Sequence, residues 1–464
     1  MDDFILDHQR QHINKETLMQ KAKASMRPYY GITFVIGLGF FTMGLMDPLY
    51  DTYVPMFLTN FLRSDGIVGL IMGVDNLFAL MLIPIVAALS DRTRTPIGRR
   101  MPYIIVTLPL TAVFFAMLPG AALKSLAFLI IVIFFLNVFK QAARGPVVAL
   151  MPDIIPGEFR SEANGVINTM GGIAAIVGTV GLARLFDMNL TLPLFGKTLV
   201  PFPGETVRGS TDTYIGSLPF LISALLVILA TVLLFIFIKE KKSSQAKEEE
   251  KSVPVFTSLK MILGSREKSA LFILLALFLW FIGYQGVLPW IGIYGVDFLG
   301  LSPGTSALSA GMVGIAYALF AIPSGIVAHK IGRKKTIRIS LTFLTIITTL
   351  LFFHYPLTSM LGLSQTAGFL SFWVILFLFG AFWVSVVTNS FPMLWQMATY
   401  ANMGIYTGLY YFFSQGAGIV APGITGVLRD LFGPRIIFLA AAVCMGAACL
   451  LMGFVHRGEA ETTD

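Results

Sequence analysis

The stretch Ser90–Arg100 reads Ser-Asp-Arg-Thr-Arg-Thr-Pro-Ile-Gly-Arg-Arg and places four arginines within eleven residues. Long apolar stretches flank it on both sides. Because hydrocarbon cannot hold so much charge, the stretch must lie in water at one face of a membrane. Cytoplasmic loops of membrane proteins carry an excess of lysine and arginine, which predicts that this face is cytoplasmic.

A weaker copy of this basic loop occurs much later in the chain. Gly325 is followed by the stretch His329–Lys335, which reads His-Lys-Ile-Gly-Arg-Lys-Lys and again lies between apolar stretches. A basic loop at the same place in each half indicates a transporter built from two related halves.

The composition identifies a membrane protein with many spans. Of the 464 residues, 56% are hydrophobic and only 12% are charged, about half the charged fraction of soluble domains. The net charge of +8 does not indicate a nucleic-acid partner, because most of the chain has no solvated face. The partner that the composition requires is a lipid bilayer.

Long apolar runs predict an all-α fold of twelve transmembrane helices in two six-helix bundles with a central cavity. The expected spans lie at about 31–58, 66–90, 102–120, 125–152, 162–186, 215–239, 268–295, 305–329, 336–356, 367–391, 402–428 and 435–456. The expected domains are an N-terminal tail (1–30), a first bundle (31–239), a charged linker (240–267), a second bundle (268–456) and a C-terminal tail (457–464).

The distribution of cations predicts the orientation. With the N-terminus inside, cytoplasmic segments hold 24 of the 33 lysines and arginines, outside segments hold seven, and two lie within spans. This bias places both termini in the cytoplasm and the protein in the cytoplasmic (plasma) membrane. The polar N-terminal stretch has no short apolar segment followed by small residues, so it is interpreted as a cytoplasmic tail, not a signal peptide.

Five ionisable residues fall within spans of the first half: Asp47, Asp51, Asp75, Lys140 and Arg144. A lone charge at mid-membrane costs about 2.5–3.5 kcal/mol, so these side chains should face the interior. The two aspartates of the first span are four residues apart, as are the two cations of the fourth, so each pair shares a helix face. We expect acid to face base across the cavity and to contact a substrate or a coupling proton.

A purely structural interpretation of these charges stays open. A buried ion pair can fix helix packing and do nothing else. Asp47 precedes Pro48 and Asp75 precedes Asn76, so either aspartate could stabilise local helix geometry, and Lys140 could extend along its helix toward water.

The second half carries neutral polar and aromatic residues instead of charges. All five tryptophans lie there: Trp280, Trp290, Trp373, Trp383 and Trp395. An aromatic face stacks on a sugar ring while amides and hydroxyls bind its edge, so the expected pocket residues are Trp280, Tyr284, Gln285, Trp383 and Asn389. The alternative is an interfacial belt with lipid contacts, which suits Trp290 and Trp395 near span ends.

The basic loops resemble the signature loop of the major facilitator superfamily, Gly-x-x-x-Asp-Arg-x-Gly-Arg-Arg. The longer form at Ser90–Pro102 is similar to that of bacterial sucrose/proton symporter-like carriers, a branch near the glycoside–pentoside–hexuronide:cation symporters. The stretches Arg144–Asp153, Asn389–Met393 and Tyr406–Phe412 resemble the same branch. The resemblance spans nearly the whole chain and implies the superfamily's two-bundle transporter fold.

The resemblance also implies roles for particular positions. Melibiose-type carriers bind sodium with paired aspartates, where this chain has Ala79 and Ile83, which favours proton coupling. Relatives often carry an acid in the seventh helix, where this chain has Leu288, so the pocket departs from the usual one. The resemblance further implies that a gating loop latches the two halves on the cytoplasmic side. Its expected members are Asp91, Arg92, Arg99, Arg100 and Arg333.

The leading hypothesis is a proton-coupled symporter for a sugar or glycoside that works by alternating access. The alternatives are a proton-coupled exporter of amphipathic small molecules and a solute sensor with a transporter fold. An enzyme is not expected, because the spans contain no metal-ligand cluster and the five histidines are scattered. No catalytic residue, metal or cofactor is therefore predicted.

Overall fold

The computed structural model describes residues 26–156, 159–187, 192–194, 197–199, 217–240, 262, 264, 267–397 and 403–458. Apart from a two-stranded hairpin (β1, Leu192–Leu194, and β2, Lys197–Leu199), these residues are almost entirely helical. Most of the expected linker, most of both tails and most of the segment 188–216 lie outside the described residues, so their predicted boundaries stay a proposal.

The first group of long helices follows the predicted spans closely. A serine caps the start of two of them: Ser64 accepts the backbone N–H of Ile67, and Ser125 accepts that of Phe128. These caps satisfy N–H groups that a helix start leaves unpaired. The helices are α2 (Tyr30–Thr59), α3 (Asp65–Arg92), α4 (Met101–Lys124), α5 (Leu126–Ile154), α6 (Arg160–Ile176) and α7 (Leu218–Phe237). A short 3₁₀ turn, η1 (Arg27–Tyr29), precedes them, and α6 continues through η3 (Val177–Leu182) and η4 (Ala183–Asp187).

The second group differs from the predicted spans at one point. Its first span is broken at Gly286 and Val287, because Pro289 in the following turn has no N–H to continue the helix. The helices are α9 (Ser269–Gln285), α10 (Leu288–Leu299), α11 (Pro303–Ile331), α12 (Arg333–Met360), α13 (Gln365–Trp395), α14 (Met403–Phe432) and α15 (Ile436–Gly453).

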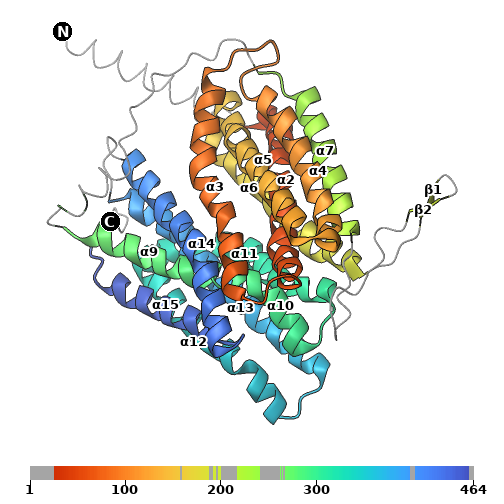
Figure 1. Cartoon of the computed structure of the whole chain (residues 1–464). Helices are drawn as coiled ribbons and strands as arrows, with labels where there is room; N and C mark the ends of the chain where they lie inside the picture. The colour runs from red at the N-terminus through yellow and green to blue at the C-terminus, as the bar shows by residue number, and fades with distance from the viewer. Residues whose placement is uncertain are drawn as a thin grey trace, which may run out of the picture.

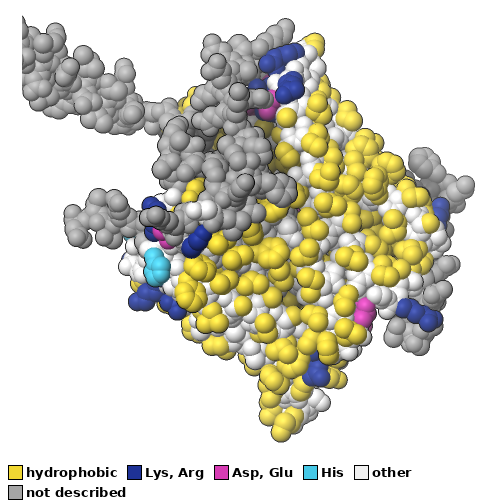
Figure 2. All heavy atoms as spheres, turned by 60° about the vertical axis from the view of Figure 1, so that its left-hand side comes forward, with side chains coloured by type: hydrophobic (Ala, Val, Ile, Leu, Met, Phe, Trp, Pro, Cys, Tyr) yellow, Lys and Arg dark blue, Asp and Glu magenta, His cyan; other side chains and the backbone are white. Residues whose placement is uncertain are grey.

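The described helices confirm the all-α membrane fold with twelve spans. Eleven candidate spans are long and apolar enough to cross a membrane. The twelfth long helix, α14, has 30 residues and is rich in glycine. Figure 2 shows a largely hydrophobic face whose charged side chains gather toward its edges. This distribution is the one expected of a surface in contact with lipid.

The two groups of helices form two bundles that meet at one end (Figure 1). We call this the closed end: it is where α3 begins and α14 ends, opposite the basic loop Ser90–Arg100. There, a Cβ atom built on Gly69 would lie 1.9 Å from the backbone oxygen of Pro422, and one on Gly73 would lie 2.2 Å from that of Ile419. Only glycine permits such a close approach of two helix backbones. In Figure 1, α3 and α14 diverge from this end toward the end that carries the basic loop.

Charged groups strengthen the closed end. Arg429 donates from Nε to the Asp65 carboxylate at 2.8 Å. The Asp430 carboxylate accepts the N–H groups of Asp65 and Gly66 at 2.8 and 3.0 Å and the Ser64 hydroxyl at 2.7 Å. An acidic group at a helix N-terminus is favourable because it compensates the helix dipole and unpaired N–H groups. The last turns of α14 therefore cap the first turn of α3.

Candidate functional site

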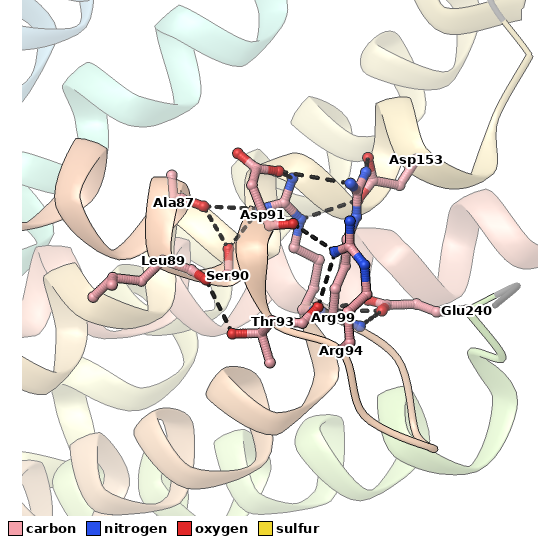
Figure 3. Close-up of polar contacts among 10 residues, drawn as sticks. Ala87, Leu89, Ser90, Asp91, Thr93, Arg94, Arg99, Asp153 and Glu240 are labelled. Atoms are coloured by element: carbon pink, nitrogen blue, oxygen red, sulfur yellow. Dashed lines mark hydrogen bonds and ion pairs between the residues drawn. The ribbon is translucent and has the colours of Figure 1, made fainter. Parts of the chain in front are cut away.

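The basic loop Ser90–Arg100 forms a dense polar network with two carboxylates from elsewhere in the first bundle (Figure 3). Arg99 donates to both oxygens of Asp153, at 2.5 and 3.1 Å, and Arg100 donates to the same carboxylate at 3.0 Å. Arg100 also contacts Asp91. Glu240, just after α7, accepts the backbone N–H groups of both arginines at the start of α4. Burial raises the pKa of the Glu240 carboxyl, against the opposing effect of these two N–H groups.

This network joins parts of a single bundle. Its members come from the end of α3, the start of α4, the end of α5 and the residues after α7. Arg92 is exposed, and Arg333 belongs to the corresponding loop of the second bundle. In this state the contacts of Asp91, Arg99 and Arg100 fix the first bundle itself. A latch between the two halves stays a prediction for a state in which the basic loops approach each other.

A second polar cluster lies within the membrane-spanning part of the first bundle. The Nζ of Lys140 lies 2.8 Å from an Asp75 oxygen and 3.3 Å from an Asp47 oxygen. Gln141 donates its side-chain N–H to the other Asp75 oxygen at 2.5 Å. One lysine of α5 therefore holds two aspartates, one from α2 and one from α3.

The structure pairs the predicted charges differently from the expected arrangement. Asp47 does face a cation of the fourth span, as predicted, but the nearest carboxylate to Lys140 belongs to Asp75. Asp51 and Arg144 are both half-buried, and neither forms a hydrogen bond or ion pair within the described part of the chain. This acid and this base, expected to face each other, are therefore not paired here.

Three polar residues around Lys140 were missing from the sequence-based prediction. Asn137 donates to the Tyr50 hydroxyl at 2.9 Å, and Lys140 lies 4.7 Å from the centre of the Tyr50 ring. Gln141 completes the binding of Asp75. Asn137, Lys140 and Arg144 recur at spacings of three and four residues, which is one helix face, so this polar stripe was a usable signal for Asn137.

The second bundle presents an aromatic stack toward the first. The rings of Tyr284 and Trp383 are parallel, with centroids 4.3 Å apart. Phe379 stacks behind at 6.3 Å from Tyr284, and Phe281 contacts Trp383 edge-on at 5.5 Å. Such offset and edge-on pairs are favourable ring arrangements. Tyr284 and Gln285 are half-buried and lie at the break between α9 and α10.

The other predicted pocket residues lie deeper. Trp280 is 0% exposed. Trp383 is 3% exposed, and Asn389 donates its side-chain N–H to the Ser385 carbonyl at 2.8 Å. In this state Trp280, Trp383 and Asn389 are buried, whereas Tyr284 and Gln285 are partly exposed.

The lipid-belt interpretation of Trp290 is wrong. Trp290 is 0% exposed, and its indole N–H donates to the Thr425 hydroxyl at 3.1 Å. The Arg429 guanidinium lies over its ring at 4.6 Å. The nearby helix α14 covers this residue, although it lies near a span end. Trp395 remains 37% exposed and donates to Thr407 at 2.8 Å, which agrees with a position near the interface.

The charged helix α2 packs directly against the second bundle. A Cβ atom built on Gly292 of α10 would lie 2.8 Å from Met56 and 2.9 Å from Thr52. The Asp51 carboxylate, one residue earlier, lies close enough to the Tyr284 hydroxyl to interact with it electrostatically. The free carboxylate and the aromatic stack therefore face the same boundary between the bundles.

Solved structures of transporters share this architecture. The chain resembles the nucleoside transporter NupG (12% identity, TM-score 0.68, covering 91% of this chain and 100% of that one). It also resembles a D-xylose-proton symporter (14%, 0.66, 93% and 98%). A third is a bacterial homologue of the human lysosomal transporter Spinster in an inward-facing, unoccupied conformation (13%, 0.65, 93% and 95%). No curated protein sequence matches the chain.

The family assignment rests on a sequence match together with the fold. The match extends from the second residue of α2 to within α14, so it covers the first bundle, most of the second and both basic loops. Since the model of the Major Facilitator Superfamily matches residues 31–422, the chain belongs to that superfamily of membrane transporters.

Proposed function

We propose that the protein is a proton-coupled symporter of a sugar or glycoside. The observation that carries the proposal is the arrangement of Asp47, Asp75 and Asp51 around Lys140. Lys140 binds the first two carboxylates at 3.3 and 2.8 Å and leaves Asp51 without a direct partner in the described residues. Three carboxylates and two cations, Lys140 and Arg144, leave one negative charge in excess. A proton on Asp51 would neutralise it.

Asp51 suits the coupling role because of where it lies. Its carboxylate interacts electrostatically with Tyr284 of the second bundle, and the next residue, Thr52, packs against Gly292. A charge at such a boundary favours water between the bundles, and a neutral carboxyl permits them to close, because burying an unpaired charge is costly. Protonation at Asp51 would thereby favour the states in which the cavity is closed.

The aromatic stack supports a sugar as the cargo. Tyr284, which stacks on the buried Trp383, offers a ring face, and the neighbouring Gln285 offers an amide that donates and accepts hydrogen bonds. Arg144 adds a fork of donors suited to hydroxyls or a carboxylate. The named activities of the similar D-xylose-proton symporter and nucleoside transporter agree with a cargo that carries a sugar ring.

The closed end supports alternating access from a state that is open toward the basic loops. The cation distribution supports placing those loops and both termini in the cytoplasm. The described state would then be accessible from the cytoplasm, in the cytoplasmic membrane. Transport requires the contact between α3 and α14 to open while the basic loops close.

The test is uptake of labelled sugars into liposomes that contain the purified protein under an imposed inward proton gradient. Uptake should require the gradient and be abolished by a protonophore. Asp51→Asn should lose gradient-driven uptake yet retain exchange of labelled for unlabelled sugar, because exchange needs no net proton movement. Asp297→Asn, which changes an exposed aspartate of α10, serves as the matched control and should transport normally.

Two results would contradict the proposal. Uptake that is indifferent to the gradient in both the unchanged protein and Asp51→Asn would exclude proton coupling at this residue. Uptake of amphipathic compounds driven by a gradient of the opposite direction, with no response to sugars, would favour the exporter.

A further inference from the structure

We propose that the groove between α12 and α15, at the end that carries the basic loops, binds the head group of an anionic phospholipid. The structure has a surface pocket of about 350 Å³ at this place. Its lining is Lys334, Lys335, Arg338, Ile339, Thr342 and Cys449. Three of these six residues are cations and none is acidic.

Two of the three cations that line this pocket have no acidic partner among the described residues. In the first bundle, the corresponding arginines contact Asp91 and Asp153. In the second bundle, the side chains of Lys335 and Arg338 are exposed and form no ion pair with any described residue. A concavity that contains these two cations favours an anion, and arginine binds phosphate through paired donors.

The helix period brings the cations and a hydroxyl onto one face. Lys334, Arg338 and Thr342 follow each other at intervals of four residues, about one turn each. Lys334 donates to the Gly453 carbonyl of α15 at 3.3 Å, and Thr342 lies 3.5 Å from the Cys449 sulfur. The groove therefore has two helical walls, and a head group in it would contact both.

The surroundings of the pocket favour a lipid over a free anion. Below Arg338, the exposed face of α12 continues through Phe343 (44% exposed) and Ile346 (56%), and α15 exposes Leu450 (72%). These side chains belong to candidate membrane spans, so they face acyl chains. An anion bound at Lys335 and Arg338 lies where head groups meet hydrocarbon. With the basic loops in the cytoplasm, the site faces the leaflet in which anionic lipids are enriched.

The experiment titrates phosphatidylglycerol into the full-length protein in neutral-detergent micelles and counts bound lipid by native mass spectrometry. Phosphatidylglycerol should bind more tightly than phosphatidylcholine. Each of Lys335→Gln and Arg338→Gln should weaken phosphatidylglycerol binding about fivefold, as expected for one cation near a charged head group. Lys330→Gln, an exposed lysine of the same basic loop outside the pocket, should leave it unchanged.

Competition by inorganic phosphate distinguishes a site for a lipid head group from a site for a free phosphate ion. Phosphate added at the lipid's own concentration should not displace phosphatidylglycerol, because it lacks the acyl chains that the apolar face binds. Equal displacement would overturn the lipid assignment in favour of a soluble anion. Equal affinity for both lipids, or unchanged binding in the pocket variants while Lys330→Gln weakens it, would overturn the site itself.

Discussion

At the scale of single residues, Lys140 is the group on which the charged centre depends. Its side chain is 6% exposed, it lies within contact distance of two aspartates, and it sits over the Tyr50 ring. A buried ion pair contributes little compared with a well-packed apolar alternative, but removal of one member leaves an uncompensated charge. The same lysine therefore affects both the stability of the bundle and the net charge of this cluster.

Replacement of this lysine should be strongly destabilising. Lys140→Met should lower the free energy of unfolding by about 3 kcal/mol, because Asp75 loses its cation while it is still held by Gln141. The double variant Lys140→Met, Asp75→Asn should recover much of the loss, and denaturant unfolding in micelles measures both. Equal destabilisation of the single and double variants would show that packing, not charge, determines the effect.

Arg100 has a comparable role at the membrane surface. Its guanidinium contacts Asp91, Asp153 and the Ala87 carbonyl together, and it is 4% exposed. Arg100→Lys should cost about 2–3 kcal/mol of unfolding free energy, since a lysine cannot reproduce this fork of donors. Arg94→Lys changes an exposed arginine of the same loop and should cost almost nothing. Similar thermal unfolding of the two variants would contradict this account.

The sequence predicted which residues are charged within the spans but not how they pair. Spacing within one helix establishes a shared face, and it predicted that an acid of the first span faces a cation of the fourth, as Asp47 and Lys140 do. It does not determine which neighbouring helix supplies the closest partner, so Asp75 on α3 was not recognised as the main contact. Trp290 was misinterpreted because position near a span end does not reveal that α14 covers it.

At the scale of helices, the contact between α3 and α14 depends on glycines, which have no side chain to keep the two backbones apart. Gly69 and Gly73 lie directly against the backbone of α14. No larger residue fits without separating the two helices.

Helix boundaries were predictable because apolar runs end at capping serines and charged loops. The break at Gly286 was not, since the apolar run continues through it without a charge.

Gly69→Ala should therefore weaken the contact between α3 and α14 at the closed end. Overpacking of this kind costs about 1–3 kcal/mol, so the population open at this end should rise about tenfold. A cysteine introduced at Met72, after Cys444 and Cys449 are replaced by serine, should react faster with a membrane-impermeant thiol reagent from the closed side. Gly314→Ala is the control, because a Cβ built there meets nothing within 4 Å. Identical labelling rates in the two variants would exclude this role of Gly69.

At the scale of the whole molecule, the two-bundle plan follows from the repetition of the basic loop. The sequence could not show which end is closed, because every state of a transporter has the same sequence. The structure shows the closed end, where Asp65 pairs with Arg429 and Asp430 caps α3. These contacts join the bundles, so their strength sets the balance between states.

Loss of the charge at Arg429 should shift that balance. Arg429→Gln removes both the ion pair with Asp65 and the cation over Trp290. Spin labels at Ile67 and Leu431, both exposed near the closed end, should report a longer mean distance in this variant. Asp65→Asn combined with Arg429→Gln should restore part of the original distribution, because no unpaired charge remains. An unchanged distance distribution in Arg429→Gln would show that the glycine contact alone holds this end.

The position of Glu240 has a consequence for the order in which the protein is made. Glu240 contacts the backbone of Arg100, 140 residues earlier in the chain. A ribosome synthesises Arg100 and Asp153 well before it reaches this glutamate. The polar network at the basic loop of the first bundle therefore cannot be complete until α7 has been synthesised. Formation of this network is therefore a late step in the folding of the first bundle, and it precedes the synthesis of the second bundle.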